Sequence, residues 1–348
     1  MRSKSRIALI AATAVAALGL SACGGGAAAP AGSNAGSNAG SSSAAPVTMK
    51  LAHNQTEAHP THIALTEFGE KLKSETNGRW NIQVFPNSTL GDQGEYLSSV
   101  STGVIDMAVV SAPQLENLNK DFVIFSLPKV FEDIDNQMKV LSDDAIVGDV
   151  YKSLESSNNI TVLGGLTQGA RSVYTKDAPA QTPASLVGKK IRVQESPVFL
   201  SMVEALGGSP TPMAYAEVYT GLQSGVIDGA ENNEISYFTQ KHFEVAPYYS
   251  YSRHLVGADF VIINANTLKK MSADDRKAFD AGWDAAWKQH TDLWKTNTTK
   301  AVEGATAGGA KFVEVDEASY ASALAPLKDK FLTTDAQKAM YDKIKASK

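Results

Sequence analysis

Cysteine is nearly absent from this chain: among its 348 residues, Cys23 is the only one. The residues beyond it therefore cannot form a disulfide with one another, and their stability has to come from packing and hydrogen bonds. Long hydrophobic runs are missing as well, because no stretch after residue 23 approaches the roughly 20 apolar residues of a transmembrane helix. These absences argue against a disulfide-built scaffold and against a polytopic membrane protein.

Positive charge is also scarce. The formal net charge is −5, and without the basic residues Arg2, Lys4 and Arg6 the remainder carries −5 − 3 = −8. This excess of negative charge argues against nucleic acid or an anionic membrane surface as a partner. Lysine supplies most of the basic residues, so each arginine is a candidate for a specific role. The arginines after residue 23 are Arg79, Arg171, Arg192, Arg253 and Arg276.

The first 45 residues have a composition that is typical of a lipoprotein leader. Residues 1–23 combine a basic start, a short apolar run and the tetrapeptide LSAC, which predicts a lipoprotein signal peptide with the lipid attached to Cys23. Residues 24–45 contain only Gly, Ala, Pro, Ser and Asn, which predicts a flexible tether. We therefore expect an extracytoplasmic protein that is anchored to the membrane by lipid, in a periplasm or cell-wall space.

Short apolar runs alternate with helical patterns along the rest of the chain. A first series of expected strands lies at 47–53, 79–85, 104–112, 123–128 and 160–166, with helices at 61–78 and around 145–159. A second series contains strands at 171–175, 189–193 and 226–231, helices at 196–208 and 214–225, a strand at 260–265, a long helix from Ser272 to about Thr306, and two terminal helices. Two runs of β/α units predict an α/β fold with two lobes.

The tetrapeptide GVID occurs in each series, at 103–106 and at 225–228. In each copy the pattern predicts a helix that ends at the glycine and turns directly into a buried strand. We expect one lobe to comprise residues 46–168 and about 257–300, and the other to comprise 169–256 and about 301–348. The cleft between the carboxyl ends of their strands is the expected ligand site, as in other open α/β sheets.

Three longer stretches resemble the solute-binding proteins of TRAP (tripartite ATP-independent periplasmic) transporters. They are NIQVFPNSTLGDQGEYLSSVSTGVIDMAVVS, GKKIRVQESP and ALGGSPTPMAYAEVYTGLQSGVIDGAENN. The similarity runs from about residue 48 to 330. It implies a two-lobed periplasmic-binding-protein (venus flytrap) fold with a long helix crossing both lobes. It also implies capture of an organic acid and delivery to the membrane permease subunits of a TRAP transporter.

The resemblance assigns ligand contacts to several residues. Arg192 in KIRV is similar to the principal carboxylate-binding arginine of the family, and Arg171 to its second arginine. A planar guanidinium offers paired donors that match a carboxylate, although either arginine could instead pair with a carboxylate of the protein. Asn232 resembles an asparagine that hydrogen-bonds the same carboxylate or a neighbouring hydroxyl.

Further candidates come from both lobes. Tyr215 falls where an aromatic ring packs over the ligand, with ordinary core packing as the alternative. The remaining candidates are polar groups suited to ligand hydroxyls: Asn54, Ser111, His59, Glu195, Gln194, His53 and Glu57. At the position of Ser111 the sialic-acid members have a glutamate, which argues against an amino-sugar acid. A cleft-facing Glu195 would repel a second carboxylate and so argue against dicarboxylates.

The histidines raise the question of a metal. His53, His59 and His62 lie within ten residues of one another, but their spacing fits no zinc signature and no HExxH motif is present. We therefore expect no metal and no cofactor. His59 is expected to hydrogen-bond a ligand hydroxyl or to cap the helix that follows it.

The combined motifs look most like the sugar-acid branch of the family, and a hexuronate such as glucuronate or galacturonate is the expected ligand. The alternatives are another monocarboxylate, a dicarboxylate, a ligand-sensing lipoprotein with the same fold, or a binding protein of an ABC importer. An enzyme would need a nucleophile with its base or paired carboxylates, and the chain has no GxSxG motif. We therefore expect no catalytic residues.

Overall fold

A computed structural model of the chain describes residues 45–347. The predicted signal peptide, the lipid site Cys23 and residues 24–44 of the predicted tether lie outside the described residues. In the part that is described, the helices are all too short or too polar to cross a bilayer.

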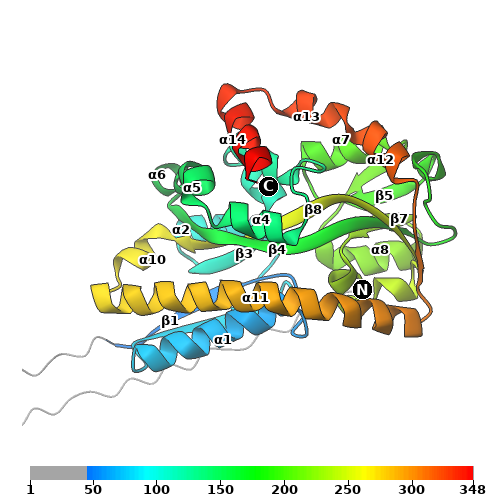
Figure 1. The fold of residues 1–348 in the computed structure, drawn as a ribbon. Helices are drawn as coiled ribbons and strands as arrows, with labels where there is room; N and C mark the ends of the chain where they lie inside the picture. The colour runs from blue at the N-terminus through cyan, green and yellow to red at the C-terminus, as the bar shows by residue number, and fades with distance from the viewer. Residues whose placement is uncertain (1–44, 348) are drawn as a thin grey trace, which may run out of the picture. The chain divides into compact units, whose positions relative to one another are not determined.

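The strands of the described part belong to one sheet (Figure 1). Their order across it is β2-β1-β3-β8-β4-β7-β5-β6, and β9 pairs with β8. The strands are β1 (Val47–Ala52), β2 (Trp80–Phe85), β3 (Met107–Ser111), β4 (Ile160–Thr175), β5 (Lys190–Val193), β6 (Ser209–Pro212), β7 (Gly229–Asn232), β8 (Tyr248–Asn264) and β9 (Lys311–Val313). The parallel strands β1, β2 and β3 form one end of the sheet, and the parallel strands β5, β6 and β7 form the other.

The antiparallel strands β4 and β8 run through the middle of the sheet and join the two lobes. The prediction of separate strands at 160–166 and 171–175 is therefore wrong, and β8 starts well before the predicted residue 260. The glycines near the centre of β4 suggest a break, but they serve close packing instead. A side chain at Gly164 would meet Trp283, and Gly169 has φ +64° and lies directly against Trp294.

Helices cover the sheet (Figure 1). They are α1 (Pro60–Glu75), α2 (Gln93–Thr102), α3 (Ala112–Glu116), α4 (Ile134–Leu141), α5 (Asp144–Lys152), α6 (Glu155–Asn158), α7 (Pro197–Ala205), α8 (Val218–Ser224), α9 (Glu234–Thr239), α10 (Ala265–Lys269), α11 (Ala273–Ala307), α12 (Glu317–Leu324), α13 (Pro326–Phe331) and α14 (Asp335–Ala346). Short 3-10 helices are η1 (Lys120–Ser126), η2 (Pro183–Leu186), η3 (Tyr215–Glu217) and η4 (His242–Glu244).

Two of these helices differ from the sequence-based expectation. The run 123–128 is not a strand, because most of it lies in η1, whose first turn is capped by the Asn119 side chain. A short buried apolar run cannot be assigned by periodicity alone. Near the end of the chain there are three helices after β9 rather than two. The last one, α14, was expected with the second lobe but packs against α5 and η1 of the first.

The long helix α11 packs against α1 of the first lobe and against α9 of the second, and so crosses both lobes as predicted. The hydrophobic core is divided in the same way. Clusters that include Leu51 and Phe260 lie mainly in the first lobe, and clusters that include Ile191 and Tyr174 lie mainly in the second. The fold is the two-lobed α/β architecture expected from the sequence.

The two GVID copies have the same local structure. Gly103 and Gly225 end α2 and α8 in the left-handed conformation, with φ of 79° and 77°. An oxygen of Asp106 accepts a hydrogen bond from the backbone N–H of Lys50 at 3.0 Å, and Asp228 accepts one from Lys190 at 2.8 Å. In each lobe the aspartate thus ties the start of one parallel strand to the neighbouring strand, so the repeat is structural.

Candidate functional site

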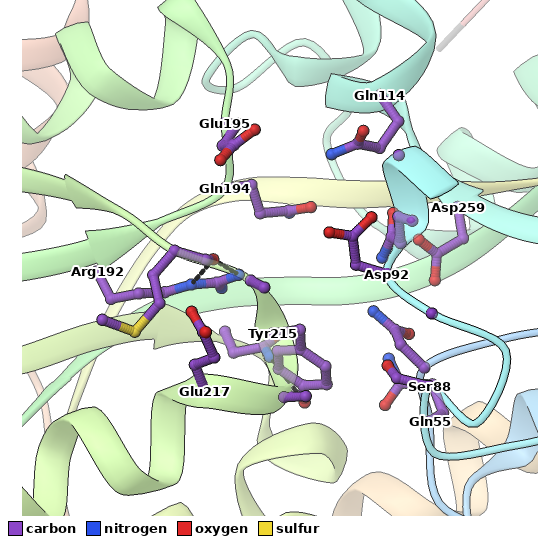
Figure 2. Close-up of a pocket in the computed structure, with 18 of the residues that line it drawn as sticks. Gln55, Ser88, Asp92, Gln114, Arg192, Gln194, Glu195, Tyr215, Glu217 and Asp259 are labelled. Atoms are coloured by element: carbon purple, nitrogen blue, oxygen red, sulfur yellow. Dashed lines mark hydrogen bonds between the residues drawn. The ribbon is translucent and has the colours of Figure 1, made fainter. Parts of the chain in front are cut away.

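A cavity of about 420 Å³ opens where the carboxyl ends of the parallel strands of both lobes meet (Figure 2). Residues after β1 and at the starts of α2 and α3 line it from one lobe. The ends of β5 and β7 and the helix η3 line it from the other. Seven amide side chains face it: Asn54, Gln55, Gln93, Gln114, Gln168, Gln194 and Asn232. Such a lining offers many hydrogen-bond donors and acceptors to a small polar ligand.

Arg192, near the end of β5, is 4% exposed and lines this cavity. Its Nε and Nη2 donate to the backbone oxygen of Met213 at 3.0 and 2.8 Å. No carboxylate of residues 45–347 forms an ion pair with it, and its Nη1 has no hydrogen bond in that range. Burial is the main reason why its pKa lies below the ordinary value. The guanidinium is therefore a desolvated cation whose charge the protein leaves without a direct counter-ion.

Arg171, on β4, also lines the cavity, but its charge is neutralised within the protein. Its Nε and Nη2 form a bidentate pair with the carboxylate of Glu231 at 2.6 and 2.7 Å, and both residues are almost fully buried. Its Nη1 donates to Gln168 Oε1 at 2.6 Å. His254 lies 3.4 Å from the same carboxylate, and burial lowers the pKa of this imidazole. Arg171 was expected to bind the ligand, with a carboxylate of the protein as the alternative partner, and this geometry matches the alternative.

Asn232 and Tyr215 meet beside Arg192. Asn232 Nδ2 donates to Tyr215 Oη at 3.3 Å, and the tyrosine ring lies 5.7 Å from the Arg192 guanidinium carbon. Burial raises the pKa of Tyr215 to about 12, so the hydroxyl keeps its proton. Together these side chains form one wall of the cavity with the guanidinium at its centre.

Ser111 is fully buried and does not line the cavity. Its hydroxyl lies 2.5 Å from Gln194 Oε1 and 2.9 Å from Gln93 Oε1, so it connects two cavity-lining amides from opposite lobes. A second contact between the lobes lies nearby, where Ser196 Oγ donates to Glu116 Oε2 at 2.8 Å. Direct contact of Ser111 with a ligand is therefore not supported, because its hydroxyl is bonded to Gln93 and Gln194, and these two glutamines line the cavity where Ser111 does not.

The histidines also lie outside the cavity lining. His59 Nδ1 accepts from the backbone N–H of Thr61, so it caps α1, which was one of the two roles expected of it. His53 lies 3.1 Å from His62 through its Nε2, and burial with the nearby His62 lowers its pKa to about 3. Glu57 is exposed and is not a lining residue. These residues follow β1 and were therefore expected near the cleft, but His59 is held by the α1 cap and His53 by its contact with His62.

Several lining residues have no counterpart in the sequence-based prediction. They are Gln55, Ser88, Asp92, Gln93, Gln114, Gln168, Glu217 and Asp259. Asp92 and Gln93 belong to the start of α2, where Asp92 forms a capping box with Glu95. Asp259 stands out in the sequence as an acid inside an apolar strand, and this is the signal that could have identified it. The described part of the chain contains no group of three His, Cys, Asp or Glu side chains arranged for a metal ion.

Two lobes that share a long helix, with a polar cavity at the carboxyl ends of their strands, are the architecture of a protein that binds a small solute. The family follows from comparison with known proteins. The chain belongs to family 7 of the bacterial extracellular solute-binding proteins, the DctP family, which matches residues 51–334. This confirms the resemblance to TRAP solute-binding proteins.

Solved structures of similar proteins hold sugar acids. A TRAP periplasmic solute-binding protein from Anaerococcus prevotii with bound D-glucuronate is 38% identical, with a TM-score of 0.84 over 86% of this chain and 97% of that one. One from Xanthobacter autotrophicus with bound β-D-galacturonate is 32% identical, with a TM-score of 0.82 over 86% and 100%. A solute-binding protein from Chromohalobacter salexigens is 32% identical over 276 residues, 79% of this chain and 82% of the relative.

Proposed function

We propose that this TRAP solute-binding protein captures a hexuronate, glucuronate or galacturonate, and delivers it to a membrane permease. The single observation that carries the proposal is Arg192, a buried guanidinium without a carboxylate partner that faces a cavity rich in amides. The ligand carboxylate supplies the missing anion, and the amides hydrogen-bond the ring hydroxyls. The uronates bound to similar proteins support this choice of ligand.

The other predicted contacts fall into two groups under this proposal. Asn232, Asn54, Gln194, Glu195 and Tyr215 line the cavity and contact the ligand. Arg171 lines the cavity but orients the neighbouring side chains rather than binding the ligand carboxylate, because Glu231 and Gln168 occupy most of its hydrogen-bond donors. Ser111 acts through Gln93 and Gln194, since it lies beneath both.

Capture is proposed to close the two lobes over the ligand. We keep the predicted limits of the lobes (46–168 with about 257–300, and 169–256 with about 301–348), except that α14 is assigned to the first lobe because it packs there. The hydrogen bonds of Ser111 with Gln194 and of Ser196 with Glu116 join the lobes beside the cavity. Saturating D-glucuronate is expected to reduce the radius of gyration in small-angle scattering, and an unchanged radius with bound ligand would contradict closure.

The ligand assignment is tested by isothermal titration of the full-length protein in detergent. D-Glucuronate or D-galacturonate should bind, whereas D-glucose, which lacks the carboxylate, should bind at least tenfold more weakly. Arg192→Lys keeps the charge but loses the planar fork, so it should weaken uronate binding more than tenfold. Arg253→Lys is the matched control, because Arg253 pairs with Glu314 at the surface. Equal binding of glucose and glucuronate would rule out the proposed function.

We further propose that Cys23 carries the lipid that holds the protein at the membrane. Cys23→Ser should release the protein into the soluble fraction without changing its melting temperature, since a lipid chain supplies the membrane affinity. Membrane sedimentation after a high-salt wash measures this directly. A variant that still sediments with the membrane would contradict the anchor.

A further inference from the structure

The cavity contains one available cation. Arg171 and Arg192 are its only basic lining residues in the described part of the chain, and no lysine is among them. Arg171 is paired with Glu231 through two charge-assisted hydrogen bonds. Arg192 is therefore the one lining side chain whose positive charge is free to bind an anion, and it accommodates a single carboxylate.

More acidic than basic side chains line the cavity. They are Asp92, Glu195, Glu217 and Asp259. Figure 2 shows Asp92 and Asp259 together on the side of the cavity away from Arg192. The side of the cavity away from Arg192 therefore carries Asp92 and Asp259, while Glu195 and Glu217 lie on the Arg192 side (Figure 2).

Asp259 is held in a fixed position at this acidic end. It is 5% exposed, and its Oδ1 accepts a hydrogen bond from Gln168 Nε2. Gln168 in turn accepts from Arg171, so the buried ion pair orients the glutamine. The other oxygen of Asp259 has no hydrogen-bond donor among residues 45–347. A nearly buried, oriented acceptor without a partner is suited to a ligand hydroxyl.

Asp92 lies at the start of α2, which would otherwise attract an anion. Its Oδ1 accepts from the backbone N–H of Glu95 at 2.9 Å, and the Glu95 side chain accepts from the Asp92 N–H at 2.8 Å. This capping box occupies the end of the helix and places a carboxylate there. The helix terminus therefore offers no compensation for a second ligand carboxylate.

We propose, on the basis of the proposed function, that Asp259 and Asp92 form a subsite that accepts hydroxyl groups of the ligand and excludes a second carboxylate. A carboxylate oxygen accepts hydrogen bonds from sugar hydroxyls, whereas a ligand anion at the same place meets like charge, and the nearby cation Arg171 is already paired with Glu231. The subsite makes the protein selective for sugar monocarboxylates over aldarates and other dicarboxylates. Burial raises the pKa of Asp259 to about 6, so most of this group is ionised above neutral pH.

The test is isothermal titration of the full-length protein in detergent at pH 7.5 with D-glucuronate, D-gluconate and D-glucarate. Gluconate and glucarate are both open-chain six-carbon acids, and they differ only in the terminal group, a hydroxymethyl in one and a second carboxylate in the other. The ratio of their dissociation constants therefore isolates the second charge. Glucarate is expected to bind wild type at least tenfold more weakly than gluconate.

Variants of the two aspartates test whether their charges cause the difference between the dissociation constants of glucarate and gluconate. Asp259→Asn and Asp92→Asn keep the shape of the side chain and remove its charge, so each should narrow the ratio at least threefold. Asp280→Asn is the matched control, because Asp280 is an exposed acid on α11 that pairs with Arg276, and it should leave the ratio unchanged.

The outcomes separate the two proposals. Failure of both D-glucuronate and D-galacturonate to bind would overturn the proposed function. If glucuronate binds, the subsite is overturned by wild type that binds glucarate as tightly as gluconate, or by a ratio that neither variant changes. It is also overturned if neither open-chain acid displaces glucuronate, since the ring would then decide selectivity. The wild-type ratio and Asp92→Asn keep the test decisive if Asp259→Asn does not fold.

Discussion

Arg171 on β4 and Arg192 on β5 line the same cavity, and both are more than nine-tenths buried. They differ in whether the protein itself provides a carboxylate for the guanidinium. Arg171 has the carboxylate of Glu231 against its fork at 2.6 and 2.7 Å, whereas Arg192 has only the backbone oxygen of Met213. A buried charge without a partner is costly, so a cation of this kind indicates a site that a ligand completes. One arginine belongs to the architecture of the site, and the other is its anion receptor.

The largest expected effect is on stability, at Arg171. Arg171→Ala leaves the buried Glu231 carboxylate without its counter-ion, which should lower the free energy of unfolding by about 3 to 5 kcal/mol. Urea denaturation of the unliganded protein measures this loss. If Arg171→Ala were as stable as wild type and had lost only its affinity for uronate, the structural role assigned to Arg171 would be wrong.

The pH dependence of stability should distinguish the same two residues. Burial acts to raise the pKa of Glu231, but the charge of Arg171 and the hydrogen bonds from His254 and Arg171 outweigh it and hold the pKa at about 2, below its ordinary value of 4.5. The stabilisation is therefore complete above pH 4.5 and is lost as the pH falls towards 2. It amounts to roughly 3 kcal/mol.

Glu231→Gln should lack this decline of stability between pH 4.5 and 2, and Arg192→Ala should retain it. Urea denaturation at a series of pH values gives both curves. An acid decline that disappears in Arg192→Ala as well would mean that the charge of Arg192 also holds down the pKa of Glu231.

The smallest expected effects come from the aromatic ring beside each arginine. The Arg171 guanidinium carbon lies 5.8 Å from the Phe199 ring, and that of Arg192 lies 5.7 Å from the Tyr215 ring. Phe199→Leu should lower stability by about 1 kcal/mol with uronate affinity unchanged. Tyr215→Leu should weaken affinity about fivefold, and Tyr215→Phe, which keeps the ring, should retain most of it. Thermal melts and uronate titrations of Phe199→Leu and Tyr215→Leu measure both quantities. Lost affinity in Phe199→Leu together with lost stability in Tyr215→Leu would contradict the roles assigned to the two arginines.

The sequence predicted the parts of the site that depend on local order along the chain. Arg192, Gln194 and Glu195 follow one strand, and Asn232 ends another, so the carboxyl ends of parallel strands bring them to one edge. Their placement needs only the strand order and the direction of each strand. The two-lobed fold was predictable for the same reason, with the resemblance to TRAP proteins supplying the long shared helix.

The missing parts depend on contacts between distant residues. Glu231 reaches Arg171 because β7 pairs antiparallel with β4 in a register that sets Val173 opposite Glu231. Asp259 faces the cavity because the long strand β8 continues through both lobes between β3 and β4. No local pattern specifies these registers. His59 caps α1, which is one of the two roles expected of it, and it does not line the cavity.

The account depends most directly on Arg192→Ala, measured in two ways on the same full-length sample. Titration with D-glucuronate should show binding weakened by at least about thirtyfold, because removal of one member of a desolvated charge pair costs on the order of 2 to 5 kcal/mol. The melting temperature without ligand should stay within about 2 °C of wild type, since the protein provides no counter-ion that the substitution would strand. A melting temperature that falls as far as that of Arg171→Ala, with the remaining folded protein still binding glucuronate, would contradict the central claim.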